Sequence, residues 1–294
     1  MYSITLLLTA VLAFAAMAAA NYTEYVDAYT FTHWGQTHEA SKFDYELAMA
    51  KSAVTLLKSR LGAAGDNLTV PQTKADLPAT ESALHTTKAN LGPDGLLKLL
   101  QPDIADGNKY WHDVIAKSDG VNWKPSNSQT VCFIPSLSAV TFGLWATSAA
   151  VDSVNDDVNP EHYIKQTSTG SNGLPQSTVL EGWGGVVTYF DIQNFTAPDH
   201  KKYPFLRQLP DYPVQAAGPK VLKDGTDTAF GVLHIAVKDV QDAEYGEGFE
   251  AHSTIWYPSG ATADHLEAES EHMVNEVINL AIDASKTLKS LKLV

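Results

Sequence analysis

Residues 263–294 read ADHLEAESEHMVNEVINLAIDASKTLKSLKLV, and this stretch decides how the rest of the chain can pack. Acidic residues gather between Asp264 and Glu271, and Lys286, Lys289 and Lys292 follow, a polarity that complements the helix macrodipole. Apolar residues recur at helical spacings and form one stripe: Leu266, Met273, Val277, Leu280, Ala284, Leu288 and Leu291. The pattern predicts a long C-terminal helix that buries a single face.

A polar strip runs beside this stripe. His265, Glu269, His272 and Glu276 follow one another at spacings of four, three and four, so they lie on one side of the helix. Glu-x-x-His on a helix can bind a metal ion when other helices supply further ligands. We find no second motif of this kind. We therefore interpret the strip as a solvated charged face and expect no metal and no other cofactor.

The residues before this helix are typical of β-structure. Between Ser126 and Pro258 the apolar runs are short, rich in β-branched and aromatic residues, and separated by Gly, Pro and Asn. The segment 140–150 fits a helix or a strand equally well. The predicted strands are Thr130–Ile134, Gly184–Ile192, Gly231–Val237 and Glu250–Tyr257. Nearly continuous apolar runs in two of them predict strands that are covered on both faces.

The N-terminal part is predicted to be helical. Apolar residues from Phe43 to Leu61 recur every three or four positions, and Gly62 would end that helix. Further helices are expected at 95–100 and 108–117, and residues 62–84 resemble a loop or linker. The fold class is therefore α+β, with a helical N-terminal part, an antiparallel β-rich middle and a long C-terminal helix. We divide the chain into a helical segment 21–107, a β-rich region 108–245, and a final strand and helix 246–294 that forms one unit with 108–245.

The first twenty residues are typical of a signal peptide. Ile4 to Met17 is apolar, close to the ~7–15 residues of a signal core and shorter than the ~20 of a membrane span. Ala18-Ala19-Ala20 offers a small-residue cleavage site. We interpret residues 1–20 as a signal peptide, with a buried N-terminal helix as the alternative, and expect a secreted, extracellular protein. No long apolar run follows, so we expect no membrane anchor.

Three sequons agree with secretion. Asn21, Asn67 and Asn194 each begin an Asn-x-Thr triplet, the acceptor pattern for N-glycosylation. Asn67 follows a glycine- and alanine-rich stretch typical of a loop, so it is the preferred site. We expect a glycoprotein.

Charge and cysteine content limit the possible partners. The formal net charge of −14 disfavours nucleic acid, which binds proteins largely through Lys and Arg. Cys132 is the single cysteine, so the chain has no intramolecular disulfide. Val131 and Phe133 flank it, and we therefore expect a small buried hydrophobic residue rather than a nucleophile.

No catalytic motif stands out. The chain lacks a Gly-x-Ser-x-Gly elbow, a Walker loop and His-Glu-x-x-His, and Gly182-Trp-Gly-Gly185 fits a turn or bulge. His33 and His38 lie near Glu39 and Asp44 in the sequence. A histidine with a carboxylate can act as general acid and base, but the same residues are also common in a polar loop before a helix. Four further histidines are spread across the β-rich half: His112, His162, His234 and His252. A histidine in the middle of an apolar strand, such as His234, is expected to be a core residue that donates a hydrogen bond to a backbone carbonyl.

Two segments resemble the boxes of the fasciclin domain. The first is Thr130-Val-Cys-Phe-Ile-Pro-Ser-Leu-Ser-Ala139, and the second is Phe230-Gly-Val-Leu-His-Ile-Ala236. The residues that carry the resemblance are Phe133, Pro135, Ser136, His162, Tyr163, Gly231 and His234. The physical sense of the first box is a buried strand that ends at proline, with a hydroxyl residue that caps the helix that follows. The resemblance implies a wedge of two small sheets. It also implies a secreted adhesion or accessory protein, such as fungal ones that assist a laccase-type step in aromatic polyketide pigment biosynthesis.

Three functional hypotheses follow. The first is the fasciclin-like accessory protein, whose partner would be another secreted enzyme or a cell-wall component. The second is a cup-shaped lyase, isomerase or cyclase, in which one curved sheet wraps the C-terminal helix around a hydrophobic small molecule. The third is a structural cell-wall protein without a ligand. The aromatic residues that a cup would use are also typical of a core: Trp145, Trp183, Tyr189, Phe190, Trp256 and Tyr257. Sheet topology separates the first hypothesis from the second.

Overall fold

A computed structural model describes residues 22–34 and 41–290. Within these residues the strands form one nine-stranded sheet in the order β1-β2-β3-β9-β8-β7-β6-β5-β4. Every neighbouring pair is antiparallel. The strands are β1 Tyr22–Val26, β2 Tyr29–Trp34, β3 Trp123–Phe133, β4 His162–Thr169, β5 Pro175–Trp183, β6 Val186–Gln193, β7 Val214–Leu222, β8 Ala229–Asp242 and β9 Gly246–Pro258.

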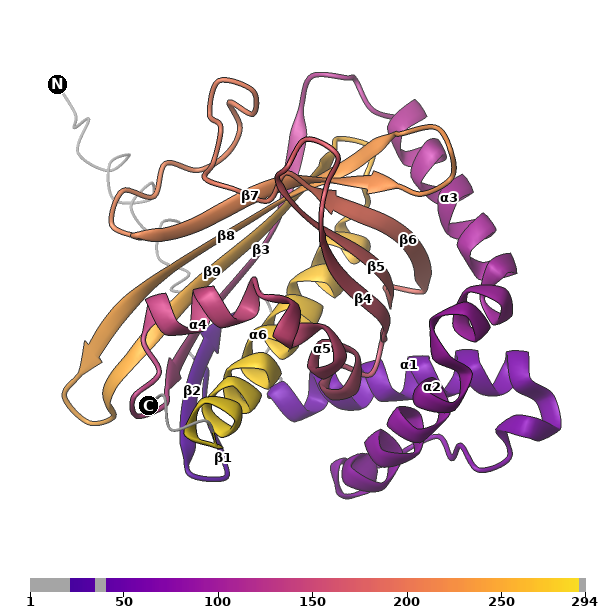
Figure 1. The fold of residues 1–294 in the computed structure, drawn as a ribbon, viewed down its shortest axis with the longest axis horizontal. Coiled ribbons are helices and arrows are strands. Elements are labelled where there is room, and N and C mark those ends of the chain that lie inside the picture. Colours follow the sequence, from indigo (N-terminus) through magenta and orange to yellow (C-terminus); the bar gives the residue numbers. More distant parts are fainter. Residues whose placement is uncertain (1–21, 35–40, 291–294) are drawn as a thin grey trace, which may run out of the picture.

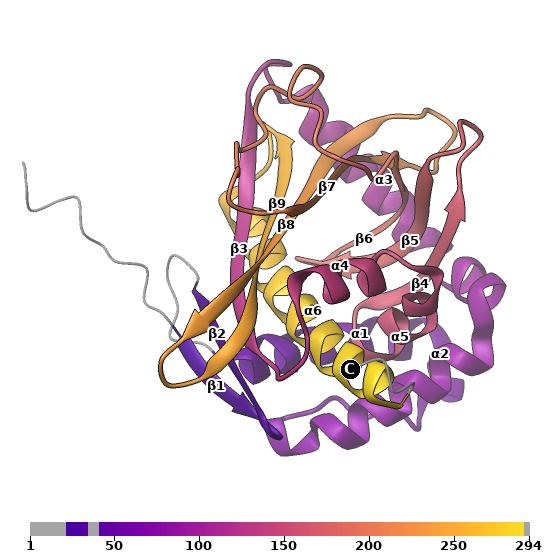
Figure 2. The ribbon, with the colours of Figure 1, turned by 60° about the vertical axis from the view of Figure 1, so that its left-hand side comes forward.

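The long helix α6, Ala263–Ser290, lies on the concave side of this sheet. In Figure 2 it runs diagonally between the β3–β9 side and the β4–β5 side of the molecule. Buried residues of α6 such as Val277 and Ile278 pack with Phe31, Cys132 and Ala251 from the inner face of the sheet. A sheet that curves around a helix in this way forms a cup, and the expected α+β class is confirmed.

The remaining helices cover the outer face of the sheet and the edge of its concave side. Helices α1 Lys42–Leu61 and α2 Leu77–Leu99 pack against the outer face of β4–β6, through a cluster that includes Leu57, Leu96 and Leu180. Helix α3, Gln101–Ala116, inserts Trp111 at one end of the concave side. The short helices α4 Ala139–Ala146 and α5 Asp152–Val158 lie beside α6 on the open side (Figure 1).

The predictions that rested on strong periodicity are confirmed. Helix α1 ends at Gly62, whose φ of 56° is a left-handed conformation that glycine adopts easily. All four predicted strands exist, although each belongs to a longer or shifted element. Helix α6 extends through Ser290, and Leu291 of its predicted stripe lies outside the described residues. The stretch 140–150 is helical at its start, in α4.

Several expectations were wrong. The segment 21–107 is not wholly helical, because the hairpin β1–β2 extends the sheet by pairing with β3. The loop predicted to reach residue 84 ends at Leu77, since a capping box at Thr73 and Asp76 leads into α2. The expected hydroxyl cap of the helix after Pro135 is present, however, at Ser138, whose side chain accepts a hydrogen bond from the amide of Thr141 in α4. Ser136 itself has a positive φ of 70°.

The arrangement of strands differs from the one that the fasciclin resemblance implied. A wedge would separate two small sheets and place the strand around Cys132 beside the strand around His234. Instead β3 pairs with β2 and β9, and all strands belong to one sheet. The topology therefore favours the cup.

Two sequence predictions concern the chain ends and the surface. The predicted signal peptide 1–20 and the sequon at Asn21 lie outside the described residues. Among residues 22–34 and 41–290, none of the helices has the length and apolar character needed to span a membrane. Asn67 is exposed in a turn, as predicted, and Asn194 is half-buried with a left-handed φ of 51°.

Candidate functional site

A cavity of about 430 Å³ lies between the concave face of the sheet, α4 and α6. Much of its wall is apolar and comes from all three sides, including Phe142, Leu233, Ile235, Met273 and Leu280. Its charged lining among the described residues consists of His162, Lys165, Glu181, Lys220 and Glu276. Lys165 pairs with Asp152 at 3.5 Å, and the other four are joined by contacts with one another or through Asn155. The cavity thus combines a hydrophobic wall with a charged group of side chains.

The network forms where β4, β5 and α6 meet. His162 begins β4 and pairs in register with Glu181 of β5, so both face the inside of the cup. Helix α6 brings His272 against His162, and Glu161 immediately precedes β4. Residues more than a hundred positions apart therefore meet within hydrogen-bond distance.

The polar strip of the C-terminal helix is not solvated, contrary to expectation. His265, Glu269 and His272 retain 4%, 1% and 3% of their accessible surface. The physical reason is the position of α6: the sheet wraps it, so the strip beside the apolar stripe also meets strands rather than water. Glu276, one turn further, is half-buried and accepts a hydrogen bond from Asn155 at 2.9 Å.

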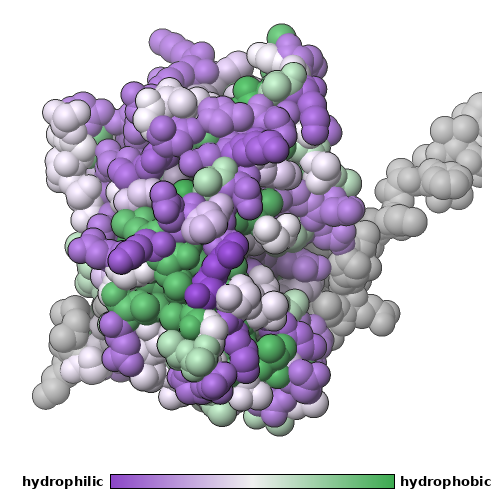
Figure 3. All heavy atoms as spheres, turned by 90° about the vertical axis from the view of Figure 1, so that its right-hand side faces the viewer, coloured by the Kyte–Doolittle hydropathy of each residue, from purple (hydrophilic) through white to green (hydrophobic). Residues whose placement is uncertain are grey.

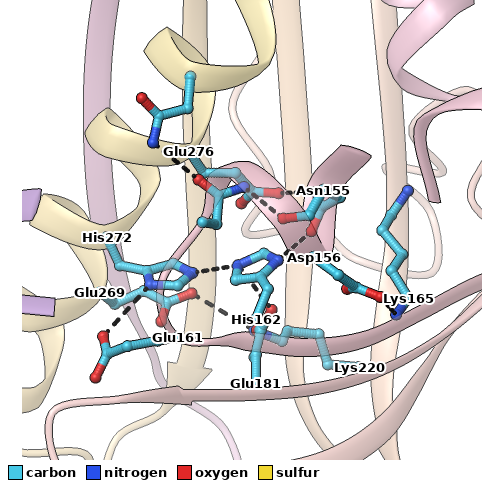
Figure 4. A network of polar contacts seen from close by, with 12 residues as sticks. Asn155, Asp156, Glu161, His162, Lys165, Glu181, Lys220, Glu269, His272 and Glu276 are labelled. Carbon is cyan, nitrogen blue, oxygen red and sulfur yellow. Dashed lines mark hydrogen bonds and ion pairs between the residues drawn. The ribbon is translucent and has the colours of Figure 1, made fainter. Parts of the chain in front are cut away.

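The two histidines face each other through the same ring nitrogen. His162 Nε2 and His272 Nε2 are 2.9 Å apart, and Glu181 Oε2 is 3.4 Å from His162 Nε2. The opposite nitrogens differ in their surroundings. His162 Nδ1 bonds Asn155 Oδ1, whereas His272 Nδ1 faces Glu161 Oε2 at 3.9 Å, beyond hydrogen-bond distance. Figure 4 shows the two rings pointing toward each other between Asn155 and Glu161.

The surroundings give the two imidazoles opposite protonation. Burial lowers the pKa of His162 well below its ordinary value, and the charge of Glu181 offsets only part of this effect. Burial also acts against charge on His272, but Glu161, Glu181 and Glu269 outweigh it and raise the pKa of His272 to about 9. The pair therefore carries one positive charge at neutral pH, on His272, whose Nε2–H donates to Nε2 of His162.

Lys220 supplies the buried cation of the network. Its Nζ lies 3.3 Å from Glu181 Oε1 and 3.5 Å from Glu269 Oε1, and also sits 4.3 Å from the centroid of the Trp183 ring. Burial opposes its charge, but Glu269 and Glu181 raise its pKa above the ordinary value. Lys220 is thus a permanent positive charge at the cavity wall.

Outside the cup, a second hollow approaches the same network. A cleft of about 660 Å³ lies between α1, α3 and the β5–β6 turn, and Glu161 and Trp183 line it. Figure 3 shows this side of the molecule, where hydrophobic side chains gather among hydrophilic ones. Glu161 therefore belongs to the cleft, whereas His162 lines the cavity.

The aromatic residues that a cup was expected to use are core residues instead. Trp183, Phe190 and Tyr257 pack with Trp111 at the closed end of the cup. Trp145 belongs to the core around α4 and α6, and Trp256 stacks on the outer face of the sheet. Tyr189 packs on the outer side as well. None of these six lines the cavity.

The remaining histidines are dispersed. His234 is buried as predicted, but its Nε2 contacts the side chain of Gln215 at 3.1 Å rather than a backbone carbonyl. His252 lies 3.3 Å from Arg207 on the same outer face, and His112 pairs with Asp224 at 2.7 Å. His33 is buried 3.6 Å from Glu24, and His38 lies outside the described residues.

The residues of the fasciclin resemblance do not converge. Phe133 ends β3, Tyr163 is buried against the α1–α2 layer, and Gly231 packs on Tyr257. Of the seven, His162 alone lines the cavity. Cys132 is fully buried, as predicted, and burial raises the pKa of its thiol.

Comparisons with known proteins add little to this geometry. No family model matches the chain, and no curated protein matches it. Among solved structures, the chain is similar to the crystal structure of Ara h 8.0201, with a TM-score of 0.36 and 11% identity, over 55% of this chain and 98% of that chain. A similarity at this level does not indicate a function.

Proposed function

We propose that this protein binds a small, largely apolar molecule inside the cup and holds an oxygen-bearing group of that molecule against His162, Glu181 and Lys220. The observation that carries the proposal is the cavity of about 430 Å³, which falls within the usual size of small-molecule sites. An apolar wall with a few convergent polar groups is the common form of such sites. The apolar wall provides affinity, and the charged network fixes orientation.

Helix α4 forms one side of the entrance to the cavity. Val140 and Leu144 line the cavity, yet they keep 50% and 69% of their surface exposed. Exposed apolar side chains that continue into an apolar cavity are typical of the rim of a ligand-binding groove. We therefore place the mouth of the cavity at α4, where these two residues form a hydrophobic lip.

The network also carries groups suited to acid–base chemistry. Lys220 can polarise a carbonyl oxygen, and Glu276, oriented by Asn155, can take a proton from the neighbouring carbon. The electron pair of the broken C–H bond would move to the oxygen. The reaction is complete when the proton returns to a different atom of the bound molecule or when a leaving group departs from it. We extend the proposal to a lyase, isomerase or cyclase of this type.

The cup replaces the fasciclin-like adhesion or accessory role as the proposed function. That role rested on a wedge of two sheets, and the strands form one sheet. Secretion and glycosylation at Asn67 are independent of this choice and remain proposals from the sequence.

A fluorescent probe tests the binding proposal. Anilinonaphthalene sulfonate has an apolar ring system and one anionic oxygen group, and its emission rises when apolar surroundings exclude water. We expect the folded protein to bind it with one dominant site. Ile235→Trp should abolish this binding by filling the cavity, whereas Val121→Trp, at an exposed position outside the cavity, should leave it unchanged. Equal binding by both variants would refute the proposal.

A further inference from the structure

We propose that His162, His272 and Glu181 form a binding site for Zn²⁺ that is open toward the cavity. One nitrogen or oxygen of each residue lies within 4.8 Å of the others. The two Nε2 atoms are 2.9 Å apart, and Glu181 Oε2 is 3.4 Å from His162 Nε2. Ligand atoms around tetrahedral zinc, with bonds of about 2.0–2.2 Å, are separated by roughly 3.3 Å. The three side chains are therefore close to the spacing that zinc requires.

The groups behind these ligands have the arrangement of an outer shell. Metal-binding histidines usually place their second nitrogen against a carboxylate, an amide or a backbone oxygen, which fixes the ring. His162 Nδ1 bonds Asn155 Oδ1, and His272 Nδ1 faces Glu161 at 3.9 Å. Glu181 directs Oε1 to Lys220, which leaves Oε2 toward the histidines. His162 and Glu181 thus each have one atom bonded by the scaffold and one atom directed toward the other ligands, and His272 faces the carboxylate of Glu161 without a hydrogen bond (Figure 4).

The local charge also fits a cation. Four carboxylates, Glu161, Glu181, Glu269 and Glu276, surround the histidines, and Lys220 is the buried lysine that pairs with two of them. Both carboxylate oxygens of Glu269 are buried without a hydrogen-bond partner among the described residues. Buried negative charge is costly when positive charge does not match it. The positive charges beside these carboxylates are Lys220 and the imidazolium of His272, and a divalent ion that replaced the proton on His272 would raise the positive charge by one.

Two histidines and one glutamate leave a fourth position free, which is the form of a catalytic rather than a structural zinc site. His162 and Glu181 line the cavity, so that position faces the bound molecule. A zinc ion there would polarise the oxygen of the ligand together with Lys220, and Glu276 would stay free to accept a proton. This role of the fourth position rests on the proposed function, whereas zinc binding itself does not.

Calorimetric titration of the chain with Zn²⁺, after tag removal and chelator treatment, tests the site. We expect one ion per chain, and Co²⁺ in its place should show the visible absorption of a tetrahedral site. His162→Ala and His272→Ala should weaken binding by on the order of 100-fold or more, and Glu161→Gln by on the order of 10-fold. His112→Ala is the control, because His112 also pairs with a carboxylate, that of Asp224, but is not part of the cluster.

The proposal is wrong if the wild type binds no zinc, or if His272→Ala binds it as the wild type does. Should the histidine variants not fold, the isosteric Glu161→Gln decides, since equal affinity for this variant and the wild type contradicts the site. Probe binding by the chelator-treated protein is measured in parallel. If the protein binds the probe but not zinc, the metal site alone is refuted. If the protein binds zinc but not the probe, the cup proposal alone is refuted.

Discussion

Replacement of Lys220 by Met tests whether the charged network is as deeply buried as the structure shows. Lys220 lies 3.3 Å from Glu181 and 3.5 Å from Glu269, and the three side chains keep 4%, 9% and 1% of their surface. Met preserves the apolar stem and removes the charge. Breaking a buried ion pair by removing one partner costs about 3–5 kcal/mol, because the remaining charge is left uncompensated. We expect Lys220→Met to lower the free energy of unfolding by that amount.

Urea unfolding with a chelator present measures this cost. Lys220→Met/Glu269→Gln should recover part of the loss, since it removes one uncompensated charge. Lys223→Met is the matched control, because Lys223 pairs with Asp191 at 3.0 Å but keeps 31% of its side-chain surface exposed. Such pairs contribute about 0–1 kcal/mol. A loss below about 1 kcal/mol for Lys220→Met would refute a buried network.

Three further predictions concern the scaffold. Burial lowers the pKa values of His234 and His252 to about 4, so the unfolded chain takes up protons below about pH 6.5 while the folded chain does not. The free energy of unfolding should therefore fall by about 1.5–2 kcal/mol per histidine between pH 7 and pH 5, and His234→Gln should reduce this fall in urea titrations at the two pH values. Gly107→Ala should cost about 1–3 kcal/mol in thermal unfolding, because its Cβ would lie 1.9 Å from the carbonyl oxygen of Val187; an unchanged melting temperature would contradict the packing of α3 on β6. Cys132 should react with a thiol reagent after denaturation but not before, and rapid labelling of the native protein would be inconsistent with its burial in β3.

The sequence was informative where one period continued over many residues. The apolar stripe of α6 and the face of α1 were predicted because burial of a helix face requires that spacing. The strands β4 and β5 were missed, since polar residues such as Lys165, Gln166 and Ser177 interrupt any apolar run. The hairpin β1–β2 was missed as well, because its pairing with β3 depends on residues about a hundred positions away.

The candidate site could not be predicted from local patterns. Periodicity shows that His272 lies beside a buried stripe, but it does not show what faces that side of the helix. The decisive contact joins His272 to His162 from another element. The adjacent pair Glu161-His162 is a sequence signal for this site. It offers a carboxylate and an imidazole at the start of a strand, the same two groups that Glu269-x-x-His272 offers on the helix. Neither motif identifies the other without the fold.

The position of a bound molecule tests the cup most directly. Met273 lines the cavity, whereas Met49 is buried in the core between α1 and α6 without contacting it. In methyl-labelled protein, with the two signals assigned through Met273→Leu and Met49→Leu, anilinonaphthalene sulfonate should shift the Met273 methyl resonance and leave that of Met49 in place. Saturable probe binding that leaves the Met273 resonance unmoved would contradict the cup as the ligand site.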